Sequence, residues 1–319
     1  MGDSKTAGTQ STPASVDISH ALHSVVSVRS SIAEDALTAP VLGTERVGHG
    51  AVISDDGLIL TMGYLIVEAE SVWLVDQHEN MIPAHVVAYD QESGFGLVQA
   101  LQRIDAPAIP LGHSSQLDVT SQVVLAGCGD ASQIVQTRVI GKQEFAGYWE
   151  YVLDEAIFTS PPHPNWGGTA LIGPDGKLYG IGSLALHTMS RDQEVEAANM
   201  VVPIDLLPPI LDDLRGYGRR STPSRPWLGW FVEEAYNVLI VSGVYKDGPA
   251  FEAGIEPGDI VLAVDGAAVD SLAELFRRVW AIGEAGVEVS VELRRVEETR
   301  HVSVRSVDRY TAFKPARLH

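Results

Sequence analysis

Short apolar runs separated by turn residues dominate the chain from about residue 47 to residue 202. Turn signals such as Asp55-Asp56-Gly57 and Gly173-Pro174-Asp175-Gly176 interrupt these runs. Many short strands with Gly, Asp and Pro between them are typical of an all-β sandwich or barrel. The strands predicted here are 50–54, 58–61, 71–75, 84–88, 96–100, 122–126, 135–140, 169–172 and 178–183.

Two segments that flank this region have helical spacing. From Val16 to Val28, the pattern is that of a short helix running into a strand. Pro203–Leu214 predicts one helix, because its apolar residues recur at helical intervals.

A second unit follows a segment rich in Gly, Pro, Ser and Arg, which predicts a linker with little to bury. In this unit, strands are expected at 237–244, 260–264, 288–294 and 301–304. An amphipathic helix is expected over 271–282, with Ser271 as its N-cap. The predicted division is a disordered leader (1–15), a first domain (16–215), a linker (216–225), a second domain (226–310) and a tail (311–319).

The composition of the chain limits the classes of partner that it is expected to bind. The 319 residues carry a formal net charge of −20, which disfavours binding to nucleic-acid phosphates or to an anionic membrane surface. The single cysteine, Cys128, rules out an intrachain disulfide and Cys-rich metal sites. We predict no metal and no cofactor. The first residues lack the apolar region of a secretory signal, so we expect a cytoplasmic protein, or an exported one whose leader was removed.

The second unit resembles a PDZ domain. The motifs that carry the likeness are Trp227-Leu228-Gly229-Trp230, Lys246-Asp247-Gly248-Pro249-Ala250, Pro257-Gly258-Asp259-Ile260-Val261 and Val264-Asp265-Gly266. In that family, such a loop holds a peptide C-terminal carboxylate on backbone N–H groups, and the peptide adds as a strand. The resemblance implies a peptide-binding loop at Trp227, Leu228, Gly229 and Trp230. The alternative is that Trp227 and Trp230 pack the two domains together.

The first unit resembles the trypsin-like domain of the HtrA family. The matching motifs are Gly48-His49-Gly50-Ala51-Val52-Ile53, Asp56-Gly57-Leu58-Ile59-Leu60-Thr61, Leu111-Gly112-His113-Ser114-Ser115 and Asn165-Trp166-Gly167-Gly168. The resemblance implies a mainly β fold: a trypsin-like double six-stranded β-barrel, then a PDZ domain built as a small β-barrel with one or two helices. Family members usually form trimers through N-terminal aromatic residues. Residues 1–63 contain none, so a monomer or dimer is an equal expectation.

The residues aligned with the family's catalytic triad lack its chemistry. A serine protease needs a hydroxyl, an imidazole and a carboxylate that act together. The chain has Tyr64 at the histidine position, Gly94 at the aspartate position and Trp166 at the serine position. Pro164 stands two residues before the nucleophile position and has no N–H to shape an oxyanion hole. Trp166 is expected to fill the cleft.

A rebuilt site is the alternative. Ser160, His163 and Thr169 lie near the old nucleophile position, and folding could bring His49 and His187 close. The simpler expectation for Ser160 and His163 is solvation, because prolines surround them. Thr169 is expected to stand where the family has a packed proline. Cys128 is expected to be a small buried side chain at a strand end, not a nucleophile.

These patterns predict a catalytically inactive, HtrA-like pseudoprotease. It would bind peptide C-termini or unfolded segments through the PDZ domain, and could regulate an active HtrA-type protease. The competing hypothesis is an active serine-type endopeptidase that uses a non-standard site.

Overall fold

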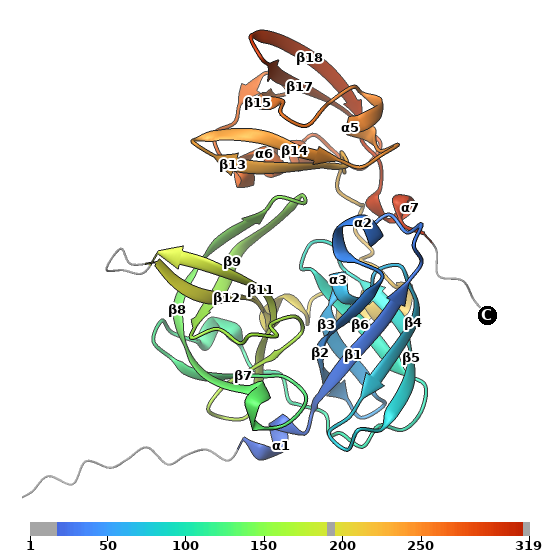
Figure 1. Ribbon diagram of the computed structural model, residues 1–319, viewed down its shortest axis with the longest axis vertical. Helices are drawn as coiled ribbons and strands as arrows, with labels where there is room; N and C mark the ends of the chain where they lie inside the picture. Colours follow the sequence, from blue (N-terminus) through green and yellow to red (C-terminus); the bar gives the residue numbers. More distant parts are fainter. Residues whose placement is uncertain (1–17, 190–194, 315–319) are drawn as a thin grey trace, which may run out of the picture.

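Two closed β-barrels form the N-terminal part of the molecule (Figure 1), for which a computed structural model describes residues 18–189 and 195–314. The predicted leader lies outside the described residues. The first barrel closes in the order β1-β2-β3-β6-β5-β4. Its strands are β1 (Val25–Ile32), β2 (Glu45–Ser54), β3 (Leu58–Met62), β4 (Ala69–Val75), β5 (Met81–Tyr89) and β6 (Phe95–Ala100). Its short helices are α1 (Ser19–Leu22), α2 (Ala39–Leu42) and α3 (Gly63–Ile66).

The second barrel closes in the order β10-β11-β12-β9-β8-β7. Its strands are β7 (Gln122–Ala126), β8 (Ile134–Gly147), β9 (Tyr151–Ser160), β10 (Ala170–Ile172), β11 (Leu178–Met189) and β12 (Val195–Pro203). Three 3-10 turns accompany it, η1 (Ser114–Gln116), η2 (Ala131–Gln133) and η3 (Ile204–Leu206). The expected double six-stranded barrel is therefore confirmed.

The single helix predicted over Pro203–Leu214 is wrong. The segment forms η3 and then, after a break, α4 (Leu211–Tyr217). Pro208 and Pro209 lie in the break. Proline has no N–H to donate and its ring disfavours helical geometry in the preceding residue, so helical spacing cannot be realised through this pair.

The C-terminal unit is one sheet in the order β13-β14-β15-β17-β18, with a short strand paired to β15. Its strands are β13 (Trp230–Ala235), β14 (Val238–Val244), β15 (Ile260–Val264), β16 (Ala267–Ala268), β17 (Glu288–Arg295) and β18 (Glu298–Arg305). Its helices are α5 (Pro249–Glu252), α6 (Leu272–Ala281) and α7 (Arg309–Ala312). The predicted helix and its cap are confirmed: Ser271 Oγ accepts from Glu274 N (3.2 Å), and Glu274 Oε2 accepts from Asp270 N (3.1 Å).

The segment expected to be a linker is anchored to the first barrel. Arg220 makes two hydrogen bonds to the buried carboxylate of Asp90, at 2.7 and 2.8 Å. After β18, the chain returns to the same barrel through α7, where Tyr310 Oη donates to Tyr89 O. The domain boundaries remain predictions, but this connection is not a free spacer.

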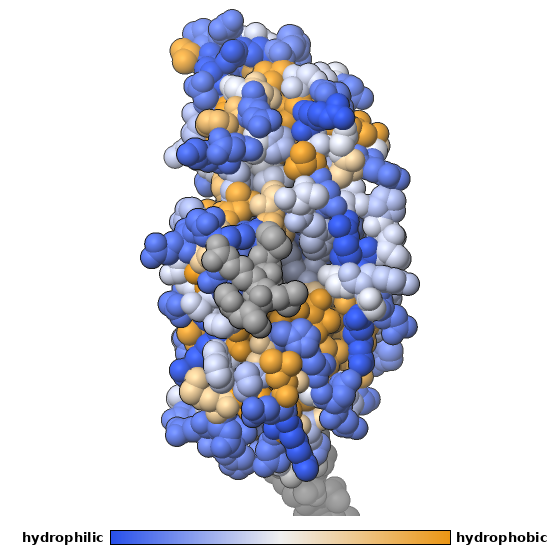
Figure 2. Space-filling model, turned by 90° about the vertical axis from the view of Figure 1, so that its right-hand side faces the viewer, coloured by the Kyte–Doolittle hydropathy of each residue, from blue (hydrophilic) through white to orange (hydrophobic). Residues whose placement is uncertain are grey.

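The hairpin of β8 and β9 joins the two units. Figure 1 shows its tip directly below β13 and α6, and Val152 of β9 belongs to the hydrophobic core of the C-terminal unit. On the face seen in Figure 2, polar side chains cover both ends of the molecule, and apolar side chains gather nearer its middle. None of the helices in the described residues is long and apolar enough to cross a membrane.

Candidate functional site

Tyr64, at the expected base position, is fixed in a structural role. It lies in α3, and its hydroxyl donates to the backbone oxygen of Ser183 (2.9 Å), which joins the two barrels. Burial raises the pKa of this phenol above its ordinary value of 10. A phenol that already donates its proton to a carbonyl and resists ionisation cannot serve as a general base near neutral pH.

Gly94, at the expected carboxylate position, has little room for a larger side chain. Its φ is +80°, a conformation that side chains disfavour. A Cβ built on Gly94 would lie 3.1 Å from Met62 Cε and 3.2 Å from the hydroxyl of Tyr151. That hydroxyl donates to Ser93 O (2.7 Å), so Tyr151 from the second barrel occupies this space.

Trp166, at the expected nucleophile position, does not fill the cleft, and that expectation is wrong. The residue is 37% exposed. Together with Tyr64 and Gly94, it lines a largely aromatic cavity of about 270 Å³ that extends to the C-terminal unit. The three triad positions therefore border one apolar cavity. A cavity with this lining can hold an apolar group, and the residue at its nucleophile position, Trp166, has no side-chain group that could attack a carbonyl.

Gly167 and Gly168 are retained for packing. The N–H of His49 donates to Gly167 O (2.8 Å), so β2 runs against the backbone of this segment. A Cβ on Gly168 would lie 1.8 Å from His49 O, and its φ is +81°. The close passage of two backbones therefore requires glycine at position 168.

The two hydroxyl groups of the possible rebuilt site, those of Ser160 and Thr169, both donate hydrogen bonds to backbone carbonyl oxygens. Ser160 Oγ donates to Ala197 O (2.9 Å), and Thr169 Oγ1 donates to Trp166 O (2.9 Å). Both residues are buried, so the expectation that Ser160 is solvated is wrong. The prolines that follow Ser160 end β9 without exposing it, because the strand still pairs with its neighbours at this point. A hydroxyl bonded to a carbonyl in this way lacks the base that would activate it.

His163 is also buried, and the expectation of a solvated ring is wrong. Its ring Nδ1 accepts from Asn165 N (3.0 Å), and Nε2 lies 3.0 Å from Gln133 O. Its backbone N–H donates to Asn199 Oδ1 (2.6 Å). The ring therefore holds a polar loop together as a neutral tautomer, with a carbonyl rather than a hydroxyl at Nε2.

His49 lies next to His163, with the ring centres 6.0 Å apart. Its Nδ1 accepts from Cys128 N (3.0 Å), and burial lowers its pKa to about 4. His187 lies on β11 and is exposed. Burial raises the pKa of the partly buried Cys128 thiol, as expected for a structural cysteine.

The loop Trp227–Trp230, here called the carboxylate loop, already holds a carboxyl group. Leu228 N lies 3.3 and 3.2 Å from the two carboxyl oxygens of Glu150, and Gly229 N lies 2.9 Å from Oε1. Trp230 belongs to the core of the C-terminal unit, and Trp227 packs on Tyr245. The alternative of two tryptophans that only join the domains does not account for these amide contacts.

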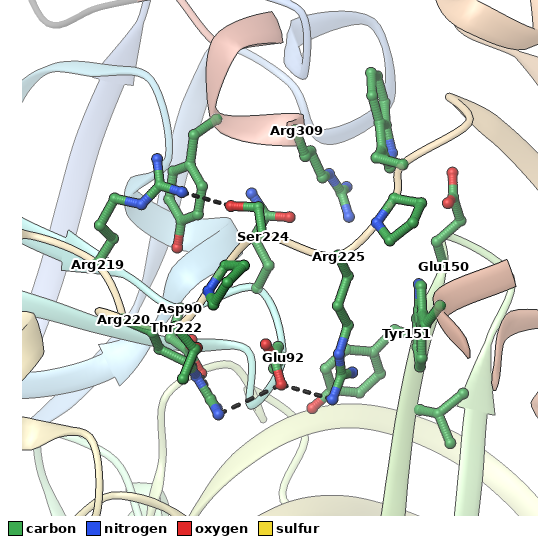
Figure 3. A pocket seen from close by; sticks show the side chains of 17 residues that line it. Asp90, Glu92, Glu150, Tyr151, Arg219, Arg220, Thr222, Ser224, Arg225 and Arg309 are labelled. Carbon is green, nitrogen blue, oxygen red and sulfur yellow. Dashed lines mark hydrogen bonds and ion pairs between the residues drawn. The ribbon is translucent and has the colours of Figure 1, made fainter. Parts of the chain in front are cut away.

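Glu150 is 7% exposed, between β8 and β9. Burial raises its pKa to about 7, against the opposing effects of Arg309 and of the N–H groups of Leu228, Gly229 and Trp230. Figure 3 shows the pocket that Glu150 and Arg309 share with the arginines of the linker. Arg309 donates to Trp149 O (3.2 Å), one residue before Glu150.

Glu150 and Arg309 are not among the residues predicted from the sequence. No motif marks either residue, because their role depends on which segment of the first domain meets the second. In the described part of the chain, no group of three or more His, Cys, Asp or Glu side chains could hold a metal ion.

Comparisons with protein families divide the chain in the same way. A trypsin-like peptidase domain matches residues 48–181, and a PDZ domain matches residues 226–305. A probable periplasmic serine endoprotease, DegP-like, from Pseudomonas fulva is 26% identical over 269 residues, which cover 79% of this chain and 53% of the relative. A protein of the same description from Halomonas elongata is 27% identical over 281 residues, covering 81% and 56%. The chain thus spans about half the length of these relatives.

Solved structures show the same architecture. The HtrA-type protease AlgW with a decapeptide superposes with a TM-score of 0.53 at 20% identity, covering 94% of this chain and 98% of that one. The serine endoprotease from Yersinia pestis gives a TM-score of 0.51 at 23% identity, covering 92% and 98%. These likenesses support the order of two barrels followed by a smaller C-terminal domain.

Proposed function

Because this chain belongs to the HtrA family, with a trypsin-like domain followed by a PDZ domain, we propose that it is a pseudoprotease that binds peptides. One observation carries the proposal: the base, carboxylate and nucleophile positions hold Tyr64, Gly94 and Trp166 around an apolar cavity. Loss of a triad member typically costs about 10⁴-fold or more in turnover.

The second candidate is an endopeptidase with a non-standard site. The relatives are named serine endoproteases, which favours enzyme activity in this family. In this chain, however, the hydroxyls of Ser160 and Thr169 donate to carbonyl oxygens, and both ring nitrogens of His163 lie against backbone groups. These bonds would have to break before either hydroxyl could attack a substrate.

The ligand we propose is a peptide C-terminus or an unfolded segment held by the PDZ domain. Two features support this class: the backbone amides of Leu228 and Gly229 already hold a carboxyl group, and AlgW was solved with a peptide. An active HtrA-type protease is a further proposed partner. The relatives are described as periplasmic, and we propose the same compartment for the full protein.

A fluorophosphonate probe, which labels activated serines, tests the absence of catalysis. We expect no labelled peptide in mass spectra of the wild-type chain under conditions that label an active HtrA protease completely. Labelling at Ser160 that disappears in Ser160→Ala would contradict the proposal and establish the rebuilt site.

A further inference from the structure

The carboxylate loop is occupied by a residue of the chain's own first domain. We propose that Glu150 is an internal ligand of the PDZ domain, and that a peptide can enter only after the tip of the β8–β9 hairpin leaves. The inference rests on the proposed peptide-binding function and adds how that site is controlled. Glu150 meets the amides of Leu228 and Gly229 as a terminal carboxylate would.

The hairpin tip, Tyr148–Glu150, also follows the edge where a peptide strand would add. The strand β13 ends its sheet, so one of its edges is free of neighbouring strands. At that edge, Val232 N donates to Tyr148 O (3.0 Å), which is a strand-type contact from the first domain. The tip therefore satisfies both a loop amide and an edge amide, the two kinds of bond that define peptide capture by strand addition.

The opposite side of the groove holds the hairpin as well. Arg277 of α6 donates to Glu144 of β8 and to Asp154 of β9. Val152 of β9 is buried in the core of the C-terminal unit, and Ala146 of β8 packs against that core. A carboxyl group in the loop with small apolar side chains beside it has the chemistry of a peptide that ends in a small aliphatic residue.

The backbone of Glu150 indicates that the carboxylate was placed at a local cost. Strands β8 and β9 pair up to Gly147 and Tyr151, which leaves a three-residue loop. Glu150 is its last residue, with φ +61°. Such loops favour Gly there, and any other residue in this conformation is strained. A carboxyl group that is buried on a strained backbone requires compensation from its contacts, here the loop amides and Arg309.

An internal ligand lowers apparent affinity without changing the site. If the occupied form outnumbers the open form about tenfold, the measured dissociation constant for a peptide rises about tenfold. Removing the Glu150 carboxylate should lower the dissociation constant again by the same factor. Glu150→Gly suits the purpose, because glycine favours a positive φ and preserves the turn.

Hydrogen exchange of the intact chain tests the occupancy without any peptide. In Glu150→Gly, we expect the amides of Leu228 and Gly229 to exchange at least about tenfold faster than in the wild type. The matched control is Glu155→Gln, which removes an exposed charge from the same hairpin. Unchanged exchange of both amides in Glu150→Gly would overturn the proposal.

Peptide binding then separates this proposal from the function on which it rests. The probes are fluorescent peptides ending in Val or Ala, each with a free or an amidated C-terminus. We expect Glu150→Gly to bind the free-acid peptides about tenfold more tightly than the wild type and Glu155→Gln do. We expect no binding of the amidated peptides. Equal binding of the free-acid peptides by all three proteins would overturn the proposal that Glu150 is an internal ligand, but it would support peptide binding by the PDZ domain. Faster amide exchange with no binding of any probe would support the internal ligand and contradict capture of this peptide class.

Discussion

At the scale of single residues, Gly168 illustrates how closely two backbones of the barrel frame pack beside the triad positions. Its replacement by alanine would place a Cβ 1.8 Å from His49 O at a φ of +81°. We expect Gly168→Ala to lower the free energy of unfolding by about 3 kcal/mol or more, because both backbones must move. Denaturant unfolding measures this.

Gly141→Ala is the matched control for Gly168→Ala. Gly141 lies in β8, and a Cβ there would have no neighbour within 4 Å. Its change in unfolding free energy should stay within about 0.5 kcal/mol. Similar losses in both variants would mean that the backbone contact at Gly168 has no special weight.

Glu150 gives a pH dependence whose sign follows from its raised pKa. The docked carboxyl has a pKa of about 7, whereas the free group has 4.5, so docking is fully stable below about 4.5 and weakens as pH rises to about 7. The groups that face it, Arg309 and Tyr245, keep their charge state over this range. Wild-type peptide affinity should therefore rise by about one to two orders of magnitude between about pH 5 and 8. This is checked by measuring peptide affinity over this pH range for the wild type and for Glu150→Gly, whose affinity should not change with pH. A flat wild-type profile would contradict the assignment.

At the scale of elements, the sequence predicted most strands and both domain types because these depend on local patterns and short motifs. Alternation and turn residues located the barrel strands, and Ser271 marked the start of α6 correctly. The prediction of one helix over Pro203–Leu214 was wrong because it rested on the spacing of apolar residues and did not take Pro208 and Pro209 into account. The triad positions were found from motifs, and their residue types are the basis for predicting that ordinary catalysis is absent.

Local patterns and short motifs do not predict contacts between residues that lie far apart in the sequence. The burial of Ser160 and His163 depends on strand pairing and on Asn199, which lies far along the chain. The role of Glu150 depends on docking between domains. Neither leaves a periodic pattern, so the loop composition pointed to solvation instead.

The anchored linker carries a prediction of its own. Burial alone would raise the pKa of Asp90, but hydrogen bonds and charge from Arg220 hold it below its ordinary value. Arg220→Ala leaves this carboxylate buried without its partner, which should cost about 3 kcal/mol of unfolding free energy at neutral pH. Arg215→Ala, which breaks the exposed pair with Asp56, should cost less than about 1 kcal/mol. Equal costs in urea titrations would contradict a structural role for the linker.

At the scale of the whole molecule, the proposed loss of catalysis involves more than three side chains. We expect the triple variant Tyr64→His, Gly94→Asp and Trp166→Ser to remain at least about 10⁴-fold below an active family member. The carboxylate introduced by Gly94→Asp would meet the Tyr151 hydroxyl and a strained backbone, and Pro164 still lacks an N–H. A peptidase assay of the triple variant checks this, and recovered turnover would show that the frame remains competent.

We propose that the chain cuts no polypeptide. The most direct measurement incubates the purified protein with an unfolded substrate such as reduced casein and searches for new termini by mass spectrometry, with an active HtrA protease as the positive control. We predict no new termini for the wild type or for Trp166→Ala. Cleavage that follows the protein through purification and is lost in Ser160→Ala or Thr169→Ala would contradict the account.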